Sequence, residues 1–311
     1  KTEALKDLGG VTALWQLAFD GYKNYESKIN SDLLFCFSQW SVDLEKKLNS
    51  KINYAIITGY CKDHVFNEKS SKVTSIKNNF NKVGVKKIIS IFDENSHDDY
   101  RWHTGHELQQ ENYYFILKKL LSTPSLGIVF KPKNVKNLKE RLGPVWNLLL
   151  EGLQTNRCYI FNEFGAETTS ASSSLAASIA DLCIHGHMCS GTAALEAALS
   201  GKSTIMIDRE GTPQTKFNIL PKDKIIFSNW ETAIEASMEF LFKDKKSLIG
   251  NWDAYLNHFD PFRDGKASLR IGEYLEWLLI ELKNGNSRSL AMELSAEKYS
   301  EIWGSKYVKR L

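Results

Sequence analysis

The sequence predicts an α/β protein organised around a doubly wound parallel sheet. Apolar runs of strand length alternate with helical segments from residue 84 to residue 243, a pattern typical of a sheet covered by helices on both faces. The 311 residues are 42% hydrophobic and 25% charged. That composition suits one to three globular domains and excludes disordered, collagen-like and disulfide-scaffold classes.

The N-terminal segment, residues 1–83, is expected to form part of a separate lobe. Its expected elements are a helix over about 3–20 interrupted at Gly9–Gly10, strands at 32–40 and 52–60, and a helix capped by Ser41. Residues 61–83 are polar and rich in lysine, asparagine and serine. This change in composition predicts the domain boundary.

The central segment, residues 84–260, is expected to form a complete Rossmann-like domain, and residues 261–311 a helical tail. Strands are expected at 85–92, 126–132, 157–163, 181–186, 203–208 and 224–227. Helices are expected at 107–121, 134–153, 170–180, 192–200, 230–243, 244–258, 265–284 and about 291–309.

Charge and cysteine content narrow the class of partner. The net charge is +3, from 40 basic and 37 acidic residues, so there is no basic excess of the kind that nucleic-acid binding requires. The five cysteines lack the CxxC spacing of zinc sites, which favours buried free thiols in a reducing compartment. No apolar run reaches the length of a membrane span and no signal peptide is visible, although the chain opens on Lys1 without a methionine. A cytoplasmic protein is expected.

Polar side chains gather where the predicted strands end. Because the carboxyl ends of parallel strands share one edge of a sheet and bind ligands there, these residues are expected to lie together. They are Asp93, Glu94, Lys131, Lys133, Glu163, His185, His187, Asp208 and Arg209. Asp93, Glu94, Asp98 and Asp99 share a loop with three histidines, which could bind a divalent cation, supply a general base, or be a solvated polar loop.

The turn Ser190-Gly191-Thr192 joins a buried strand to an alanine-rich helix. Free backbone N–H groups and the helix dipole make such a turn a phosphate site, and Glu196 one turn later could accept hydrogen bonds from sugar hydroxyls. A valine at position 191 would then block the phosphate without disturbing the fold. The alternative is an ordinary capped helix.

Three further groups are open to two interpretations. Lys131 could neutralise a departing diphosphate or be a solvated lysine. His185 or His187 could be the electrophilic or acid group near the leaving phosphate, or both could be hydrogen-bonded structural histidines. Arg263 and Arg270 are expected to pair with nearby aspartates in a structural role, the alternative being that Arg263 contacts the donor.

The segment SGTAALEAALSGKSTIMID, residues 190–208, resembles the nucleotide-binding segment of GT-B-fold glycosyltransferases. IISIFDENS and LGIVFKPK resemble the first two strands of their C-terminal domain, and HFDPFRDGKASLRIGEYLEWL the closing segment of the bacterial capsule and O-antigen enzymes. The resemblance implies a GT-B-like fold with a partial N-terminal, acceptor-side lobe. It implies catalytic roles for His187 and Lys131. It implies donor binding by Asp93, Lys131, Glu163, Ser190, Gly191, Thr192 and Glu196.

The function that follows is transfer of a sugar from a nucleotide-activated donor to a surface or lipid-linked glycan. The resemblance implies no cofactor and no bound metal, and it adds an expected peripheral contact with the inner face of the cytoplasmic membrane. Two alternatives stay open. One is a nucleotide-sugar epimerase of the same fold, and the other is a catalytically inactive GT-B lobe that acts as a binding or assembly module.

Overall fold

A computed structural model describes residues 2–19, 28–67, 70–98, 105–161, 171–188, 191–209, 211, 215–243 and 248–311. The chain divides into two compact units. Unit 1 contains Lys1–Phe66 and Tyr255–Leu311, and unit 2 contains Asn67–Ala254. The chain therefore passes between units at 66/67 and 254/255, whereas the sequence places its boundaries at 83/84 and 260/261.

Unit 2 is built on a six-stranded sheet in which every paired strand is parallel. Its strands are β4 (Lys87–Phe92), β5 (Leu126–Lys131), β6 (Cys158–Ile160), β7 (Leu182–His185), β8 (Thr204–Ile207) and β9 (Ile226–Phe227). The spatial order is β6-β5-β4-β7-β8-β9. This is the 3-2-1-4-5-6 order of the Rossmann fold, and it confirms the predicted doubly wound sheet.

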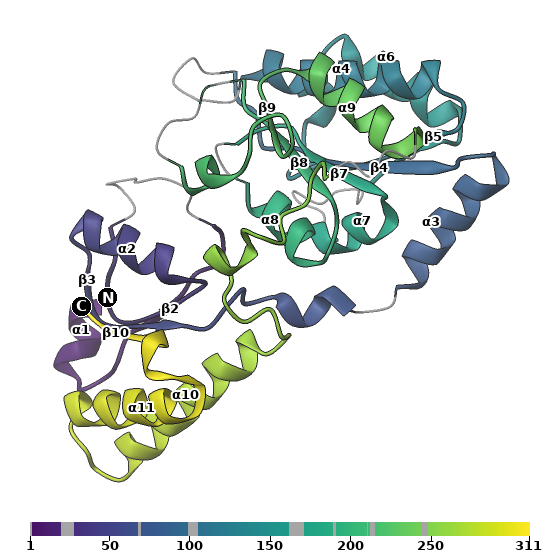
Figure 1. Ribbon diagram of the computed structural model, residues 1–311. Helices are drawn as coiled ribbons and strands as arrows, with labels where there is room; N and C mark the ends of the chain where they lie inside the picture. Colours follow the sequence, from purple (N-terminus) through teal and green to yellow (C-terminus); the bar gives the residue numbers. More distant parts are fainter. Residues whose placement is uncertain are drawn as a thin grey trace. The chain divides into compact units, whose positions relative to one another are not determined.

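Helices cover both faces of this sheet (Figure 1). One face carries α4 (His106–Ser122), α5 (Leu138–Leu142), α6 (Val145–Gln154) and α9 (Trp230–Phe242); the other carries α3 (Ser71–Lys82), α7 (Ser173–Ile179) and α8 (Thr192–Leu199). Within β4, Ile89 and Ile91 pack under the α4 layer, while Ile88 and Phe92 pack against the α7 layer. Alternating side chains are buried on both faces, which is why this strand is mostly apolar.

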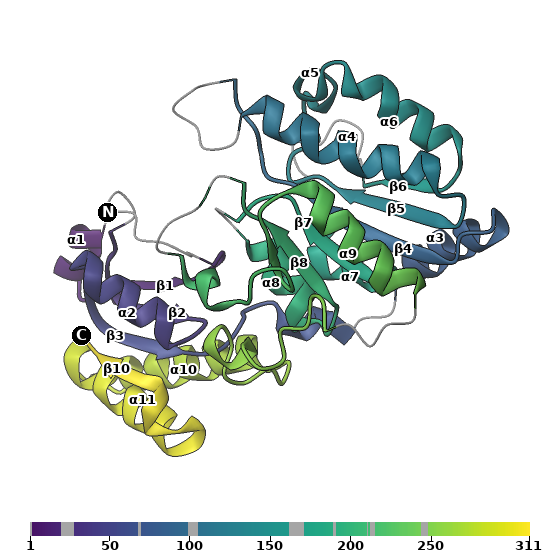
Figure 2. The ribbon, with the colours of Figure 1, turned by 45° about the horizontal axis from the view of Figure 1, so that its top comes forward.

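Unit 1 contains a four-stranded sheet in the order β1-β2-β3-β10. The strands are β1 (Ala13–Trp15), β2 (Asn30–Cys36), β3 (Lys51–Ile57) and β10 (Val308–Arg310), and only β10 is antiparallel to its neighbour. In β2, Leu33 and Phe35 pack against α10 (Ala267–Lys283) and α11 (Arg288–Trp303), whereas Leu34 and Cys36 face the α2 side (Gln39–Leu48) (Figure 2). Short helical turns and α1 (Thr2–Asp7) complete the unit; the turns are η2 (Asp63–Asn67), η4 (Leu256–His258) and η5 (Ser305–Tyr307), and unit 2 has η3 (Lys216–Ile219).

Several of the helices predicted from the sequence are wrong, and backbone geometry explains most of the differences. The helix over 3–20 ends at Asp7, because Gly9 takes φ +80° and residues 13–15 join the sheet as β1. Ser41 does not cap α2; the cap position is Ser38, and Ser41 is buried with its hydroxyl donating to Gln16.

Longer segments also divide differently. The polar stretch 61–83 contains α3, whose Ile76 and Phe80 are buried beneath a polar face. Pro144 and Gly143 split the helix over 134–153 into α5 and α6. Within 248–258 the structure has turns and η4 instead of a helix, and α11 ends at Trp303 before β10.

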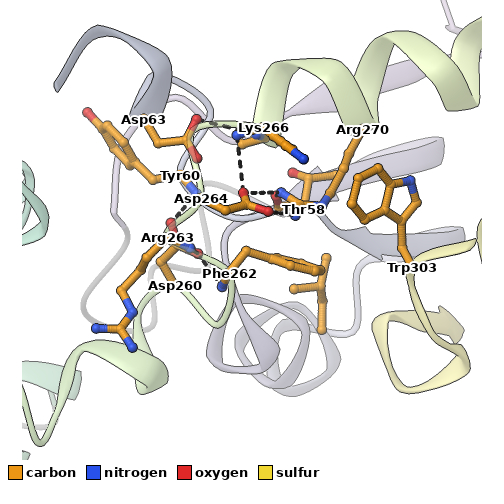
Figure 3. Close-up of polar contacts among 12 residues, drawn as sticks. Thr58, Tyr60, Asp63, Asp260, Phe262, Arg263, Asp264, Lys266, Arg270 and Trp303 are labelled. Atoms are coloured by element: carbon orange, nitrogen blue, oxygen red, sulfur yellow. Dashed lines mark hydrogen bonds and ion pairs between the residues drawn. The ribbon is translucent and has the colours of Figure 1, made fainter. Parts of the chain in front are cut away.

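A buried polar cluster in unit 1 joins the segment after β3 to the start of α10 (Figure 3). Asp260 accepts hydrogen bonds from the backbone N–H of Tyr60 at 2.9 Å and of Phe262 at 2.8 Å. Arg270 is fully buried, donates to the carbonyl of Thr58 at 3.2 Å and forms an ion pair with Asp264. This cluster gives the predicted structural role to Arg270.

Asp63 in the same cluster is expected to destabilise the protein at neutral pH. Its side chain is 3% exposed, Oδ1 accepts from the backbone N–H of Ala267 at 3.3 Å, and Oδ2 accepts no hydrogen bond from any described residue. Burial, together with the negative charges of Asp260 and Asp264, raises the pKa of Asp63.

An Asp63→Asn variant is therefore expected to raise the free energy of unfolding at pH 7 by about 1 kcal/mol, because it removes a buried unpaired charge. A raised pKa stabilises the folded state below the unfolded value of 3.8, and that contribution is lost as pH rises through the folded value. The gain should thus shrink on acidification in urea titrations at several pH values. The exposed Asp7→Asn change serves as control, and an equal gain at pH 3 and pH 7 would contradict the interpretation.

Candidate functional site

The carboxyl edge of the unit 2 sheet collects the polar residues that follow its strands. Asp93 directly follows β4, Lys131 is the last residue of β5, His187 lies two residues after β7, and Asp208 directly follows β8. These four share one edge because all their strands are parallel, as expected. Glu163 and Ser190, also predicted at this edge, lie outside the described residues.

The strand order reverses between β4 and β7, which are hydrogen-bonded neighbours. The chain moves outward through β5 and β6 on one side, and through β8 and β9 on the other. In doubly wound sheets, ligands bind where the two connections that leave such a point diverge. The residues immediately beyond the two strand ends are therefore the centre of the candidate site.

Glu94 and His185 form a buried pair at this switch point. His185 is fully buried, and its Nε2 lies 3.5 Å from Oε1 of Glu94; Oε2 accepts from Nζ of Lys133 at 2.6 Å. Burial alone would raise the pKa of Glu94. The hydrogen bond and charge of His185 and the charge of Lys133 outweigh that effect and lower it to about 2. Glu94 is thus ionised throughout the physiological range.

Asp93 is saturated by hydrogen bonds from the α4 side of the sheet. Its Oδ2 accepts from Nε2 of Gln109 and from the hydroxyl of Tyr113, both at 2.9 Å, and its Oδ1 accepts from the backbone N–H of Lys133 at 2.6 Å. Burial raises the pKa of Asp93, while the Lys133 N–H and the charge of Arg141 act in the opposite direction. This geometry favours a role for Asp93 in fixing the connection after β5 over direct contact with a ligand.

His187 is held by a polar network whose donors determine its tautomer. Oδ1 of Asn112 accepts from Nη2 of Arg209 at 2.7 Å and from Nε1 of Trp230 at 2.9 Å. Both groups can only donate, so the amide NH2 of Asn112 faces Nε2 of His187, 2.8 Å away. That nitrogen must accept, and the ring proton sits on Nδ1. Because His187 is also fully buried, the network favours a positioning role over the predicted acid role.

Lys131 is the cation that the structure leaves least engaged at this edge. Within the described residues, its ammonium makes one long hydrogen bond, 3.5 Å to the carbonyl of Pro132. Burial lowers the pKa of Lys131, against the charges of Asp93, Glu196 and Glu94, which raise it. Three carboxylates thus contribute negative charge in the surroundings of this lysine.

Glu196 has a structural contact in addition to its predicted one. It is 6% exposed, and its Oε1 accepts from the backbone N–H of Ser174 at 2.8 Å, in the first turn of α7. A carboxylate at a helix N-terminus satisfies one of the unpaired N–H groups there. Glu196 thus ties α8 to α7.

The start of α8 differs from its predicted environment. Gly191 is the N-cap residue, directly before Thr192. A Cβ built on Gly191 would lie 2.5 Å from Cε of Met206 and 2.6 Å from Cε2 of Phe217, and both side chains are fully buried. Glycine is therefore required here by close packing, and the expectation that a valine would leave the fold undisturbed is wrong.

A Gly191→Val variant is expected to lose both stability and nucleotide affinity. Overpacking of this kind costs about 1–3 kcal/mol, which should appear as a melting temperature lower by several degrees. Thr192→Ala is the matched control, since it removes one hydroxyl without the clash and should weaken calorimetric nucleotide affinity at an unchanged melting temperature. A Gly191→Val protein that melts like the parent would contradict the packing argument.

The sequence analysis missed the buried polar residues of α4 and α5 that hydrogen-bond to residues at the carboxyl edge of the sheet. Gln109, Asn112 and Tyr113 occupy buried positions of α4 at the spacing where a helix normally presents apolar side chains, and Arg141 is buried on α5. Polar residues on the apolar stripe of a helix are the signal that could have identified them.

The described residues also bear on the expectations about metal binding, membrane spans and free cysteines. No three histidine, cysteine, aspartate or glutamate side chains among them lie close enough to hold a metal ion. None of the helices described is both long and apolar enough to span a bilayer. Cys36, Cys158 and Cys183 are buried free thiols, as predicted, and Cys61 is half-buried.

Comparison with known proteins identifies relatives by structure. No family model and no curated protein matches the sequence. A putative UDP-N-acetylglucosamine 2-epimerase from Listeria monocytogenes is 13% identical with a TM-score of 0.52, the alignment covering 83% of this chain and 61% of that one. The S. aureus MnaA–UDP structure is 15% identical (TM-score 0.49; 80% and 60% covered), and the wall teichoic acid polymerase TagF is 14% identical (TM-score 0.49; 79% and 56% covered).

The chain spans about three fifths of the length of the first of these structures. The match at TM-score 0.52 establishes the fold. The protein has the α/β, GT-B-like architecture expected from its sequence, with the doubly wound sheet in unit 2 and a helical C-terminal tail in unit 1.

Proposed function

We propose that the chain binds a nucleotide sugar at the carboxyl edge of β4, β5 and β7 and transfers its sugar to a surface or lipid-linked glycan. The observation that carries this proposal is the state of Lys131. A partly buried ammonium that makes one long hydrogen bond to the described residues, on the strand next to the switch point of a doubly wound sheet, is suited to a diphosphate.

The proposed chemistry uses fixed positive charge at the leaving group. As the bond between sugar and phosphate breaks, negative charge builds on the diphosphate oxygens. Lys131 and the N–H groups that begin α8 would stabilise that charge without reorganising. Glu94 and His185 would keep the connection after β4 in place, and Glu196 would accept hydrogen bonds from donor hydroxyls. Since lysine and the helix N-terminus supply the positive charge, we propose that transfer needs no bound metal.

Epimerisation of a nucleotide sugar is the second candidate. The Listeria structure carries the name of a putative UDP-N-acetylglucosamine 2-epimerase, and the buried Glu94–His185 pair is a carboxylate–imidazole arrangement of the kind used in proton transfer. An inactive lobe that binds nucleotide sugars without turnover is the third.

A two-stage experiment separates these functions. Thermal-shift measurements with UDP, GDP, CDP, CMP, dTDP and their sugars identify the ligand, and the best donor is then incubated with the protein and resolved by chromatography. Release of free nucleotide, with water or an added glycan as acceptor, supports transfer. A new nucleotide sugar without net release supports epimerisation, and binding without turnover supports the inactive lobe. The absence of any nucleotide-dependent stabilisation would contradict all three.

A further inference from the structure

Unit 2 contains a polar cavity that none of the predicted donor-binding residues lines. Its volume is about 300 Å³, and it lies between the connection after β4 and the connection after β5. Residues at its wall include Asn95, Asp98, His106, Asn134, Glu140 and Arg141. The two helices that contribute to it, α4 and α5, cover one face of the sheet, whereas α8 covers the other. The cavity is therefore distinct from the start of α8.

A chain of hydrogen bonds with a defined direction ends at this cavity. Gln109 donates through Nε2 to Asp93, so its Oε1 is the atom that faces Ser96 and Arg141. The hydroxyl of Ser96 must donate to that oxygen. Its own oxygen then accepts from Nδ1 of His106, 2.9 Å away. The buried network thus sets the proton of His106 on Nδ1 and leaves Nε2 as a hydrogen-bond acceptor in the neutral ring.

Arg141 fixes the wall of the cavity. It is 5% exposed, and it donates through Nη1 to Gln109 at 3.1 Å and through Nη2 to the carbonyl of Asn134. These bonds hold the connection after β5 against α4. Its Nε is buried out of reach of solvent, so the donors that a ligand in the cavity can meet are the asparagine amides at the wall.

The charges around the cavity favour a neutral ligand. Arg141 and Lys136 contribute two positive charges, and Asp98 and Glu140 contribute two negative charges. A phosphate or carboxylate would meet as much repulsion as attraction. A ring bearing several hydroxyls can donate to His106 Nε2 and the carboxylates while it accepts from the asparagine amides. The volume is at the lower limit of ligand sites, which suits one such ring.

We propose that this cavity binds a monosaccharide unit at a site separate from the nucleotide. The occupant is a neutral, polyhydroxylated ring, either a free sugar or one residue of a longer glycan. The inference goes beyond the proposed donor site and does not depend on it, because no residue at the wall belongs to the predicted donor set.

Titration of the full chain with free glucose, galactose and N-acetylglucosamine tests the proposal. Binding is followed through the side-chain amide NMR signals of Asn95, Asn134 and Asn137. At least one sugar should saturate with a Kd below about 100 mM. A His106→Phe variant, which keeps a ring but loses the acceptor, should weaken that Kd about tenfold, the value of one hydrogen bond. Glu235→Gln, at an exposed position of α9 outside the cavity wall, is the control and should leave the Kd unchanged.

Three further measurements separate the alternatives. Saturating UDP should leave the sugar Kd unchanged, and displacement by UDP would overturn the separate site. Inorganic phosphate that shifts the same signals when no sugar does would overturn the neutral ligand. A short oligosaccharide that binds more tightly than its monomer would identify a glycan as the source. Sugar binding that His106→Phe leaves unaltered would place the sugar elsewhere and overturn the assignment.

Discussion

An Asp264→Ala variant is expected to lose about 3 kcal/mol of unfolding free energy, because it leaves a buried guanidinium without its counter-ion. Arg270 is fully buried, donates through both terminal nitrogens to Asp264, and has an Nε that no described residue accepts from. Its guanidinium lies 3.5 Å from the ring centroid of Phe262 and 4.3 Å from that of Trp303 (Figure 3). Aromatic faces stabilise the cation partly, but they do not replace a bidentate carboxylate.

The substitution Arg270→Met, which removes the other partner of the ion pair, should lower the free energy of unfolding by less. The side chain of Asp264 is 36% exposed whereas that of Arg270 is 1% exposed, so an Arg270→Met protein leaves an aspartate that water can still reach. Combining Asp264→Ala with Arg270→Met should recover much of the loss, because no buried charge remains. Urea unfolding followed by circular dichroism measures all three, with the exposed Glu293→Ala as control. Equal losses for the two single variants would contradict the asymmetry.

The same pair makes stability depend on pH. Burial would raise the pKa of Asp264, but the hydrogen bond and charge of Arg270 outweigh this and lower it. A lowered pKa contributes stability above the unfolded value of 3.8 that is lost as pH falls through the folded value. The parent protein should therefore lose stability on acidification more steeply than the Asp264→Ala, Arg270→Met protein.

A Lys131→Met variant is expected to lower turnover with the identified donor about 100-fold while changing the donor KM much less. Methionine keeps the unbranched stem but removes the charge that, on the proposed mechanism, acts mainly on the departing diphosphate. The parent should also lose activity at alkaline pH as Lys131 deprotonates. The midpoint of that loss should lie below pH 10.5, the ordinary pKa of lysine, because burial lowers the pKa of Lys131.

Steady-state kinetics over a pH series measures both effects. Lys224→Met is the matched control, since Lys224 is an exposed lysine of the same unit. An unchanged turnover number for Lys131→Met would show that Lys131 has no role at the leaving group. A loss of activity at alkaline pH that persists in the variant would show that another group titrates.

The sequence alone was sufficient for the sheet of unit 2 and for the position of its polar edge. A strand buried on both faces is mostly apolar, as β4 and β5 are, and parallel strands require long connections, so their order of appearance is readable from the pattern. The same reasoning failed where tertiary contacts overrode the local sequence pattern. Residues 13–15 entered a sheet because β2 offered an open edge, and α3 was overlooked because two buried side chains, Ile76 and Phe80, anchor an otherwise polar helix.

The apolar pattern was therefore enough to predict the strands with a strong period and the polar residues at their ends: Asp93, Lys131, His187 and Asp208. The contacts of those residues could be seen only in the folded chain. Hydrogen bonds from α4 orient the buried side chains of Asp93 and His187, whereas the ammonium of Lys131 makes one long hydrogen bond within the described part of the chain. Packing against Met206 and Phe217 gave Gly191 a structural requirement. The reason is physical: burial and hydrogen-bond partners come from residues distant in sequence, and they decide whether a polar group is available to a ligand.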